Sequence, residues 1–232
     1  MVNIWRKFVH FPRRCLLCGG SAGAAACCDA CRAELPWNDC ACDRCGTPLP
    51  TASPSSSATC GRCLRTPPPF EAALCAFHYR FPVDRLLVKL KFHGRLGYAR
   101  ELGLLLAEQI ERRHGDRLPE AIVPVPLHPR RVRSRGFNQA AEIARAVGAR
   151  LDLPVVTDIC ERRRDTEAQS SLSAAARQTN IRGAFSACGP LPAGRWAVVD
   201  DVVTTGATAG ELARTLLAAG ASSVLLWSPA RA

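Results

Sequence analysis

Short, unbroken apolar runs alternate along this chain with longer stretches of helical periodicity. The apolar runs predict strands at residues 72–79, 121–125, 155–156, 197–199 and 224–227. Between them, apolar residues recur every three to four positions and predict helices over 83–92, 98–113, from the Gly-Phe-Asn-Gln stretch to about 151, and 209–219. Strands buried on both faces that alternate with helices indicate a parallel sheet with right-handed crossovers. We therefore expect an α/β fold, a parallel sheet flanked by helices.

The N-terminal segment departs from this pattern. It contains few aliphatic residues, and the stretch TPLPTASPSSSAT at 47–59 has the composition of a disordered loop. The proline-rich RTPPPF at 65–70 is interpreted as a linker to the main domain. We expect residues 1–69 to form a small separate module with its linker, and residues 70–232 to form the α/β domain.

Cysteines are concentrated in this N-terminal segment. Ten of the thirteen lie between residues 15 and 63, and eight of these form four Cys-x-x-Cys pairs. Such a pair places two thiolates on one side of a tight turn, which is half of a tetrahedral zinc site. Sequential pairing predicts two structural zinc sites, the first from Cys15, Cys18, Cys28 and Cys31 and the second from Cys42, Cys45, Cys60 and Cys63.

The ligand set has open alternatives. Cys27 and Cys40 each neighbour a pair, so Cys27 can replace Cys28 and Cys40 can replace Cys42. An iron–sulfur cluster uses the same thiolate ligands, and spacing alone excludes it poorly. Disulfides are disfavoured because nothing in the segment indicates secretion. Cys75 lies in an apolar run and is expected in a buried strand.

The segment WAVVDDVVTTGAT at 196–208 combines a strand with ligand-binding side chains. Its apolar run ends in Asp200 and Asp201, at the strand end where open parallel sheets bind ligands. Two ionised carboxylates can accept hydrogen bonds from two vicinal ribose hydroxyls. The threonine hydroxyls and Gly206 that follow, together with the start of the next helix, favour a phosphate. No P-loop pattern and no GxGxxG after a strand competes with this prediction of a phosphorylated-ribose site.

A basic block, VPVPLHPRRVRSRGFNQA at 123–140, includes the end of the second predicted strand. A loop with several arginines and a glycine at this place can hold a pyrophosphate. Cations at a helix start oppose the helix dipole, which indicates that an anion is accommodated there. The charged stretch 162–169 is interpreted either as a lid that closes over the ligand or as an exposed loop.

Arginine dominates the charge of the chain. The formal net charge is +11, and only Lys7, Lys89 and Lys91 are lysines. This excess attracts polyanions, which include nucleic acid, an anionic membrane surface and phosphorylated metabolites. Arginines and Trp37 in the cysteine-rich segment permit single-strand binding through phosphate contacts and stacking, and a structural brace fits them equally well. No stretch has transmembrane length, and the basic start has no signal-peptide core, so we expect a cytoplasmic protein.

The motif VVDDVVTTGAT closely resembles the phosphoribosyl pyrophosphate (PRPP) motif of the type I phosphoribosyltransferases. The resemblance implies that Asp200 and Asp201 form the catalytic centre and hold the ribose hydroxyls. It assigns the 5′-phosphate to Thr204, Thr205, Gly206, Ala207 and Thr208. We expect Mg²⁺ to accompany PRPP, and Arg135 of the basic block to contact the pyrophosphate.

The chain as a whole resembles the ComF family. The matching pieces occur in the family's order over nearly the whole chain: four Cys-x-x-Cys pairs, KLKFHG at 89–94, the basic block, QSSLSAAARQTNIRGAF at 169–185 and the PRPP motif. The resemblance implies an N-terminal double zinc ribbon joined to a domain of type I phosphoribosyltransferase fold. That family is associated with competence for natural transformation, which is the import of single-stranded DNA.

Two function classes follow from the resemblance. The favoured one is a competence protein that binds PRPP and acts in the uptake of single-stranded DNA, with competence-machinery proteins at the inner membrane face as further partners. The alternative is a glycosyltransferase-class enzyme that transfers the phosphoribosyl group of PRPP to an unidentified acceptor. No recognisable pocket for an acceptor base or amine appears in the sequence, so turnover is left open. A regulatory module that binds PRPP without catalysis is a third hypothesis.

Overall fold

The computed structural model describes residues 14–22, 27–49, 58–115, 117–165 and 181–232 of the chain. Its contacts divide the chain into two compact units, Met1–Leu35 and Pro36–Ala232. The second cysteine group therefore belongs to the same compact unit as the α/β part. The domain boundary predicted after residue 69 stays a prediction. Most of the predicted loop 47–59 and half of the charged stretch 162–169 lie outside the described residues.

The first unit is small. It contains the short helix α1, Asp29–Ala33, and an isolated antiparallel bridge between Arg14 and Ser21. None of the residues of α1 is buried. In a small core cluster of this unit, the buried Cys15 and Cys27 pack with partly buried residues that include Cys28 and Cys31. The described residues of this unit bury so little apolar surface that their fold depends on other interactions.

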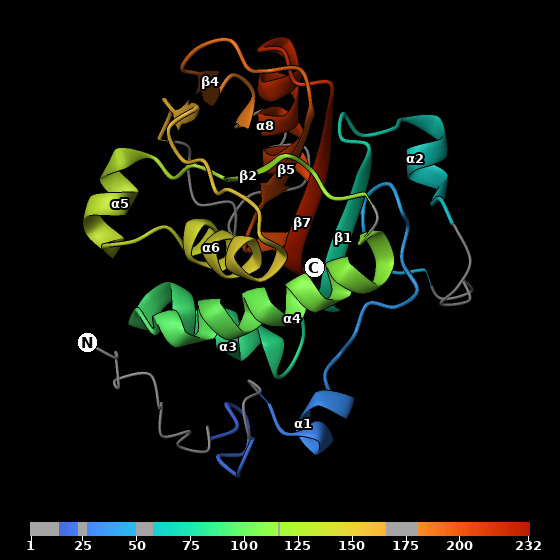
Figure 1. The fold of residues 1–232 in the computed structure, drawn as a ribbon, viewed down its shortest axis with the longest axis vertical. Helices are drawn as coiled ribbons and strands as arrows, with labels where there is room; N and C mark the ends of the chain where they lie inside the picture. Colours follow the sequence, from blue (N-terminus) through green and yellow to red (C-terminus); the bar gives the residue numbers. More distant parts are fainter. Residues whose placement is uncertain (1–13, 23–26, 50–57, 116, 166–180) are drawn as a thin grey trace, which may run out of the picture. The chain divides into compact units, whose positions relative to one another are not determined.

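The second unit contains the remaining helices and strands (Figure 1). The helices are α2 (Gly61–Arg65), α3 (Val83–His93), α4 (Leu96–His114), α5 (Pro129–Arg135), α6 (Gln139–Leu151) and α8 (Ala207–Ala218). The strands are β1 (Ala72–His78), β2 (Ala121–Pro124), β3 (Cys160–Arg162), β4 (Phe185–Ala187), β5 (Arg195–Val199), β6 (Val202–Val203) and β7 (Ser223–Arg231).

The main sheet is parallel, with strand order β1-β7-β5-β2. The short strand β6 pairs with the end of β7, beyond the end of β5. All of β7 except its first residue is buried, which matches its central position between two neighbours and under helices on both faces. Because every strand of this sheet runs in the same direction, the carboxyl ends of β1, β2, β5 and β7 meet at one edge.

Helices cover both faces of this sheet. Leu212 and Leu216 of α8 share one core cluster with Val123 and Val198 of the strands. On β2, Ile122 alternates with Val123 and therefore points to the opposite face. There α6 packs on β2 and β5, while α4 packs on α6, β1 and β7. The predicted parallel sheet flanked by helices is confirmed.

Local predictions agree with the structure over the long periodic segments and differ at short ones. The predicted strand at 155–156 is a single parallel bridge between Ile122 and Val155, since two apolar residues after a proline offer too little length for a ladder. The antiparallel pair of β3 and β4 was not predicted. Residues 129–135 of the basic block form the helix α5 rather than a loop.

Residues 36–49 pack directly against β1. The Nδ2 atom of Asn38 donates hydrogen bonds to the carbonyl oxygens of Gly46 (2.9 Å) and Cys75 (3.2 Å). The rings of Trp37 and Phe77 lie 4.5 Å apart. Gly46 has a φ of +69°, and a Cβ atom there would lie 2.7 Å from the Sγ atom of Cys75, so only glycine fits. The second cysteine segment is thereby held against the sheet.

Candidate functional site

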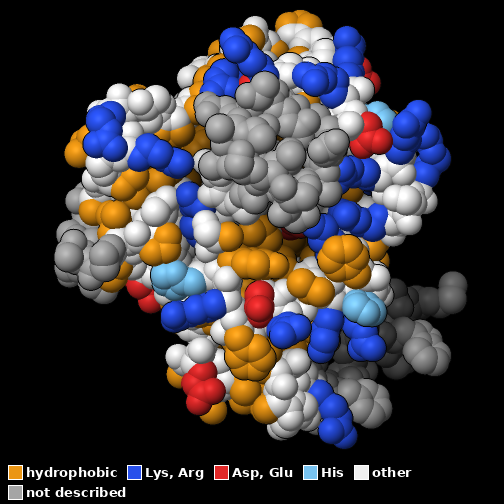
Figure 2. All heavy atoms as spheres, turned by 180° about the vertical axis from the view of Figure 1, so that it is seen from behind, with side chains coloured by type: hydrophobic (Ala, Val, Ile, Leu, Met, Phe, Trp, Pro, Cys, Tyr) orange, Lys and Arg blue, Asp and Glu red, His pale blue; other side chains and the backbone are white. Residues whose placement is uncertain are grey.

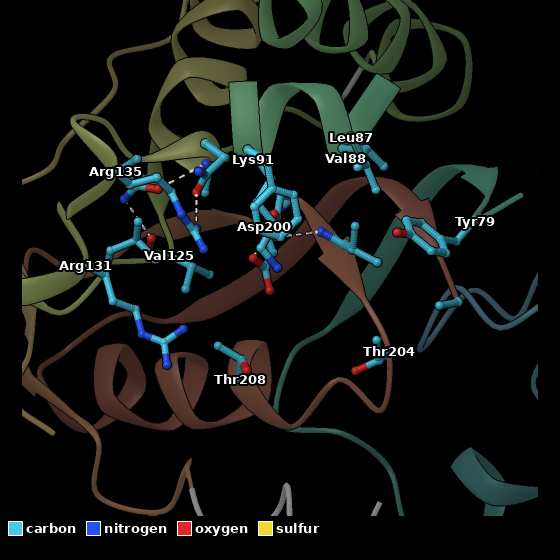
Figure 3. Close-up of a pocket in the computed structure, with 18 of the residues that line it drawn as sticks. Tyr79, Leu87, Val88, Lys91, Val125, Arg131, Arg135, Asp200, Thr204 and Thr208 are labelled. Carbon is cyan, nitrogen blue, oxygen red and sulfur yellow. Dashed lines mark hydrogen bonds between the residues drawn. The ribbon is translucent and has the colours of Figure 1, made fainter. Parts of the chain in front are cut away.

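A pocket of about 670 Å³ opens at the carboxyl edge of the sheet (Figure 3). Its described lining comes from the ends of several strands and the helices that follow them: Tyr79 after β1, Val125 after β2, Asp200 and Asp201 after β5, and side chains of α3, α5, α6 and α8. Open parallel sheets bind ligands at this edge. The volume is in the range typical of small-molecule sites.

Asp200 and Asp201 lie side by side in the pocket wall, as the motif predicts. The backbone N–H of Asp201 donates to Oδ1 of Asp200 (2.9 Å), and the N–H of Val202 donates to Oδ1 of Asp201 (2.9 Å). Burial and the neighbouring charge of Asp201 raise the pKa of Asp200 well above its ordinary value, although Arg162 opposes the shift. A carboxylate pair of this kind favours a ligand that brings cations or hydroxyl donors.

The threonine loop follows the two acids and leads into α8. Thr204 and Thr208 line the pocket, while residues 205–207 form the turn between them. Gly206 caps the helix with a φ of +78°, a conformation that few residues other than glycine adopt. The N-terminal amides of α8 begin beside the pocket, where they favour an anion.

Basic side chains line the opposite part of the pocket. Lys91, Arg131, Arg135 and Arg162 are the basic residues of its described lining, against two acidic ones. Figure 3 places Arg131 and Arg135 on one side of Asp200, with Thr204 on the other. The Nη1 atom of Arg135 donates to Oε1 of Gln139 (3.0 Å). Burial lowers the pKa of Arg135, and the charge of Asp201 counteracts this. The pocket therefore has a net positive lining suited to a polyanion.

The structure brings five of the predicted site residues together. The lining of one pocket includes Asp200, Asp201, Thr204, Thr208 and Arg135. Arg162 was not expected in the pocket, although it begins the charged stretch 162–169. Arg162 ends β3, is 8% exposed and lies over the ring of Phe185 (5.7 Å). Its signal was weak because the three-residue strands β3 and β4 have no periodicity to detect.

Other lining residues come from α3 and from the residue after β1. Two pairs of residues on α3, each spaced by four positions, form one stripe facing the pocket: Leu87 with Lys91, and Val88 with Phe92. Tyr79 lines the pocket near this stripe. The detectable signal was Lys91, a charged residue at helical spacing from Leu87. These side chains give the pocket an apolar part next to its charged part.

Two groups of four cysteines can each hold a metal ion. They are Cys15, Cys18, Cys28 and Cys31 in the first unit, and Cys42, Cys45, Cys60 and Cys63 in the second. Within each group the ligand atoms all lie within 4.8 Å of one another. These are the eight residues predicted as zinc ligands, and Cys27 and Cys40 are in neither group.

The geometry of both groups fits structural zinc. The Sγ atoms of Cys18 and Cys28 lie 3.7 Å apart, as do those of Cys45 and Cys60. Tetrahedral ligands at a Zn–S distance of about 2.3 Å have their sulfurs roughly 3.8 Å apart. The backbone N–H of Gly20 points to the sulfur of Cys18 (3.4 Å), and that of Cys60 to the sulfur of Cys42 (3.2 Å). Such donors stabilise thiolates around a metal.

Basic side chains extend well beyond the pocket. Figure 2 shows Lys and Arg side chains over much of the displayed face, with fewer acidic ones between them. This distribution agrees with the formal net charge of +11. Within the described residues, no helix is long and apolar enough to cross a membrane.

The fold and these sites define a zinc-ribbon α/β protein with a charged pocket at the carboxyl edge of its sheet. A family model of the double zinc ribbon domain matches residues 9–64. Competence protein F of Haemophilus influenzae is 34% identical over 233 residues, which cover 96% of this chain and 98% of that protein. The DNA utilization protein YhgH of Escherichia coli is 36% identical over 221 residues, covering 93% and 96%. The chain therefore belongs to the ComF family.

More distant similarities cover less of the chain. Competence protein ComFC of Streptococcus pneumoniae is 27% identical over 155 residues, covering 67% of this chain and 66% of its own length. Among solved structures, the glutamine PRPP amidotransferase from B. subtilis complexed with ADP and GMP is 21% identical and covers 55% of this chain and 25% of its own, with a TM-score of 0.37. An overlap this limited carries no argument about activity.

Proposed function

We propose that this protein is a ComF-type competence protein that binds PRPP and acts in the cytoplasm in the uptake of single-stranded DNA during natural transformation. The observation that carries the competence role is the relationship, over nearly the whole chain, to a protein named competence protein F. The YhgH relatives are named DNA utilization proteins, which supports a role connected with DNA. A net charge of +11 is suited to a nucleic-acid partner.

The PRPP part of the proposal rests on the pocket. Asp200 and Asp201, which line the pocket, would accept hydrogen bonds from the ribose 2′ and 3′ hydroxyls. Thr204, Thr208 and the turn of residues 205–207 would hold the 5′-phosphate at the start of α8. Arg135, with Arg131 beside it, would hold the pyrophosphate. Mg²⁺ fits this site because oxygen ligands from carboxylates and phosphates are those it prefers, and it would neutralise phosphate charge.

Two measurements test this function. PRPP with Mg²⁺ is expected to bind the wild-type protein in calorimetry, and the double variant Asp200→Ala/Asp201→Ala is expected to lose that binding while keeping its fold and zinc. In a transformable host that lacks its own homologue, the wild-type chain is expected to restore transformation and the double variant to fail. Full complementation by the double variant would separate the pocket from DNA uptake.

Binding of single-stranded DNA is tested separately. An oligonucleotide is expected to bind the full chain with an affinity that falls steeply as salt rises, because phosphate contacts release counterions. Competence-machinery proteins at the inner membrane face are further partners under this proposal. Binding that does not depend on salt would contradict a role for the arginines.

A second candidate function is phosphoribosyl transfer to an unidentified acceptor. The apolar part of the pocket, formed by Tyr79 and the α3 stripe, favours it because it leaves space for a flat or apolar group beside the charged part. In this reaction the arginines would stabilise charge on the departing pyrophosphate. Isotopically labelled PRPP with a panel of bases and amines tests it, and no release of pyrophosphate with any acceptor would exclude turnover for that panel.

A further inference from the structure

Arg231 is a buried cation that belongs to neither of the two cysteine groups and does not line the pocket. It lies at the end of β7, where its backbone pairs with His78 of β1 and Val203 of β6. Its side chain is buried, with the residue 6% exposed. A guanidinium removed from water needs several acceptors to offset its desolvation. One acceptor is the carbonyl oxygen of the neighbouring Ala232 (2.5 Å), and the others come from two segments far apart in the sequence.

The first set of acceptors belongs to the second cysteine group. The Nε atom of Arg231 donates to the carbonyl oxygen of Cys45 (3.3 Å), and one Nη atom donates to Oγ1 of Thr47 (2.9 Å). Oγ1 of Thr47 also lies 3.2 Å from the sulfur of Cys45. When Cys45 is a metal-bound thiolate, only the Thr47 hydroxyl can donate in that contact. Arg231 therefore fixes the hydroxyl that orients a metal ligand.

The second set of acceptors belongs to the loop that leads into α8. The other Nη atom of Arg231 donates to the carbonyl oxygens of Val203 (3.1 Å) and Thr204. Thr204 lines the pocket, and its carbonyl begins the turn that ends at Thr208. The guanidinium of Arg231 thus connects the turn at Cys45 and Thr47 to the backbone of the loop 203–208.

The cysteine segment is held firmly at this place. Asn38 binds the carbonyl oxygens of Gly46 and Cys75, and the Cα atom of Gly46 approaches Cys75 too closely for any side chain. Because the turn around Cys45 packs tightly on β1, a shift of Cys45 on metal loss cannot be absorbed there without moving its neighbours. Arg231 is the contact through which such a shift reaches the loop.

We propose that Arg231 is a positioning residue that couples metal occupancy of Cys42, Cys45, Cys60 and Cys63 to the shape of the loop 203–208, and so to the affinity of the pocket for a phosphorylated ribose. This inference rests on the proposed PRPP site. Coupling between two binding sites is reciprocal, so PRPP tightens zinc at this group by the same factor by which zinc tightens PRPP.

Substitutions at Arg231 and Thr47 test the coupling. Arg231→Met removes every donor, Arg231→Lys keeps the charge without the fork, and Thr47→Val removes the hydroxyl with little change in volume. Arg231→Met is expected to weaken binding of PRPP with Mg²⁺ by about fivefold or more, within the usual range of coupling between sites. Zinc content is expected to stay at two per chain. The matched control is Arg150→Met, on the half-exposed Arg150 that pairs with Glu111 on the surface of α6.

A chelator competition tests the reciprocal effect. PRPP is expected to slow removal of one zinc ion from the wild-type protein and to have no effect on the other, since Cys15, Cys18, Cys28 and Cys31 belong to a different compact unit. In Arg231→Met and Thr47→Val this protection is expected to disappear. Equal protection in these variants would overturn the proposal.

Hydrogen exchange distinguishes failure of this inference from failure of the proposed function. Amides of residues 203–208 are expected to exchange faster in Arg231→Met and in zinc-stripped protein, whether or not PRPP binds. If the wild type binds PRPP and Arg231→Met binds it equally well, the coupling is wrong and the PRPP site stands. If the wild type does not bind PRPP, the proposed function fails, and unchanged exchange would then remove the coupling as well. If Arg231→Met does not fold, Thr47→Val and Arg231→Lys give the same tests.

Discussion

At the scale of single residues, Asp200 combines a position in the pocket wall with a cost to stability. It lies in the pocket wall beside Asp201, and burial together with the neighbouring carboxylate raises its pKa. Folding therefore disfavours its charged form relative to the unfolded chain. Residues whose charge is held in an unfavourable environment are frequent at ligand sites, where the ligand compensates them.

We expect Asp200→Asn to stabilise the protein without ligand and to weaken its binding of PRPP. The amide keeps the shape and removes a buried charge that faces Asp201. A gain of about 1 kcal/mol would raise the Tm by about 2–4 °C in a protein of this size. Thermal denaturation without Mg²⁺ and calorimetry with PRPP measure the two effects. The control is Asp158→Asn at an exposed residue, which is expected to change neither.

The same shift gives a pH dependence. Because the folded-state pKa of Asp200 is raised, its contribution to stability is fully present below the ordinary aspartate value of about 3.9 and is lost as the pH rises through the folded-state pKa. The difference in free energy of unfolding between Asp200→Asn and the wild type is therefore expected to shrink as the pH falls through that window. Urea titrations at a series of pH values measure it, and a difference that grows on acidification would contradict the assignment.

At the scale of elements, the turn between β6 and α8 determines where the pocket's hydroxyls lie. Gly206 has a φ of +78° and is the N-cap of α8. Thr205 accepts a hydrogen bond at Oγ1 from the N–H of Ala207 (3.3 Å), which closes the same turn. The helix start is thereby held next to the two acids. This turn therefore brings the threonines of the motif and the start of α8 to the same part of the pocket.

We expect Gly206→Ala to strain this turn. A side chain in the left-handed region costs roughly 1–2 kcal/mol, so the Tm is expected to fall and PRPP affinity with it. The control is Gly97→Ala in α4, where a Cβ atom meets nothing within 4 Å and alanine favours the helix. Denaturation and calorimetry on both variants measure the difference. Unchanged PRPP binding in Gly206→Ala would mean that the turn does not position the phosphate.

At the scale of the whole molecule, the contacts separate residues 1–35 from residues 36–232. The second cysteine group is thus built into the α/β unit, where Asn38 and Arg231 connect it to β1 and β7. The two cysteine groups then have different roles: the first organises a small unit, and the second braces the edge of the sheet that carries the pocket.

Two truncations test this division. A chain of residues 36–232 is expected to fold with one zinc ion and to keep PRPP binding. A chain of residues 71–232 is expected to be less stable by several kcal/mol, because it uncovers Phe77 and removes two acceptors from the buried Arg231. Denaturation midpoints and zinc content compare them. Equal stability would place the second cysteine group outside the folded unit.

The same truncation addresses the nucleic-acid partner. If the first unit reads single-stranded DNA, residues 36–232 are expected to bind an oligonucleotide at least tenfold more weakly than the full chain, with a smaller dependence on salt. Fluorescence anisotropy at several salt concentrations measures both quantities. Undiminished binding would assign the contact to the α/β unit.

The sequence by itself determined the long elements of this protein and the cysteines of its two metal groups. Unbroken apolar runs predicted β1 and β5, because these strands are buried on both faces. Apolar residues at every third or fourth position predicted α3, α4 and α6, because each long helix must bury one face. Four Cys-x-x-Cys pairs identified both metal groups, since a tight turn of this spacing brings two thiolates together. The motif from Asp200 to Thr208 predicted one wall of the pocket, because its residues are contiguous along the chain.

Only the tertiary structure decided which distant segments meet. Arg162, Lys91 and Tyr79 reach the pocket from three separate elements, and no local pattern encodes that convergence. The bridge from Cys45 through Arg231 to Thr204 joins residues nearly the whole length of the main unit apart. Such contacts follow from strand order and burial, which depend on the packing of the complete core. Asp200 and Asp201 can be identified from the sequence alone, because they belong to one contiguous motif. The contacts of Arg231 with the loop that follows them can be identified only from the tertiary structure.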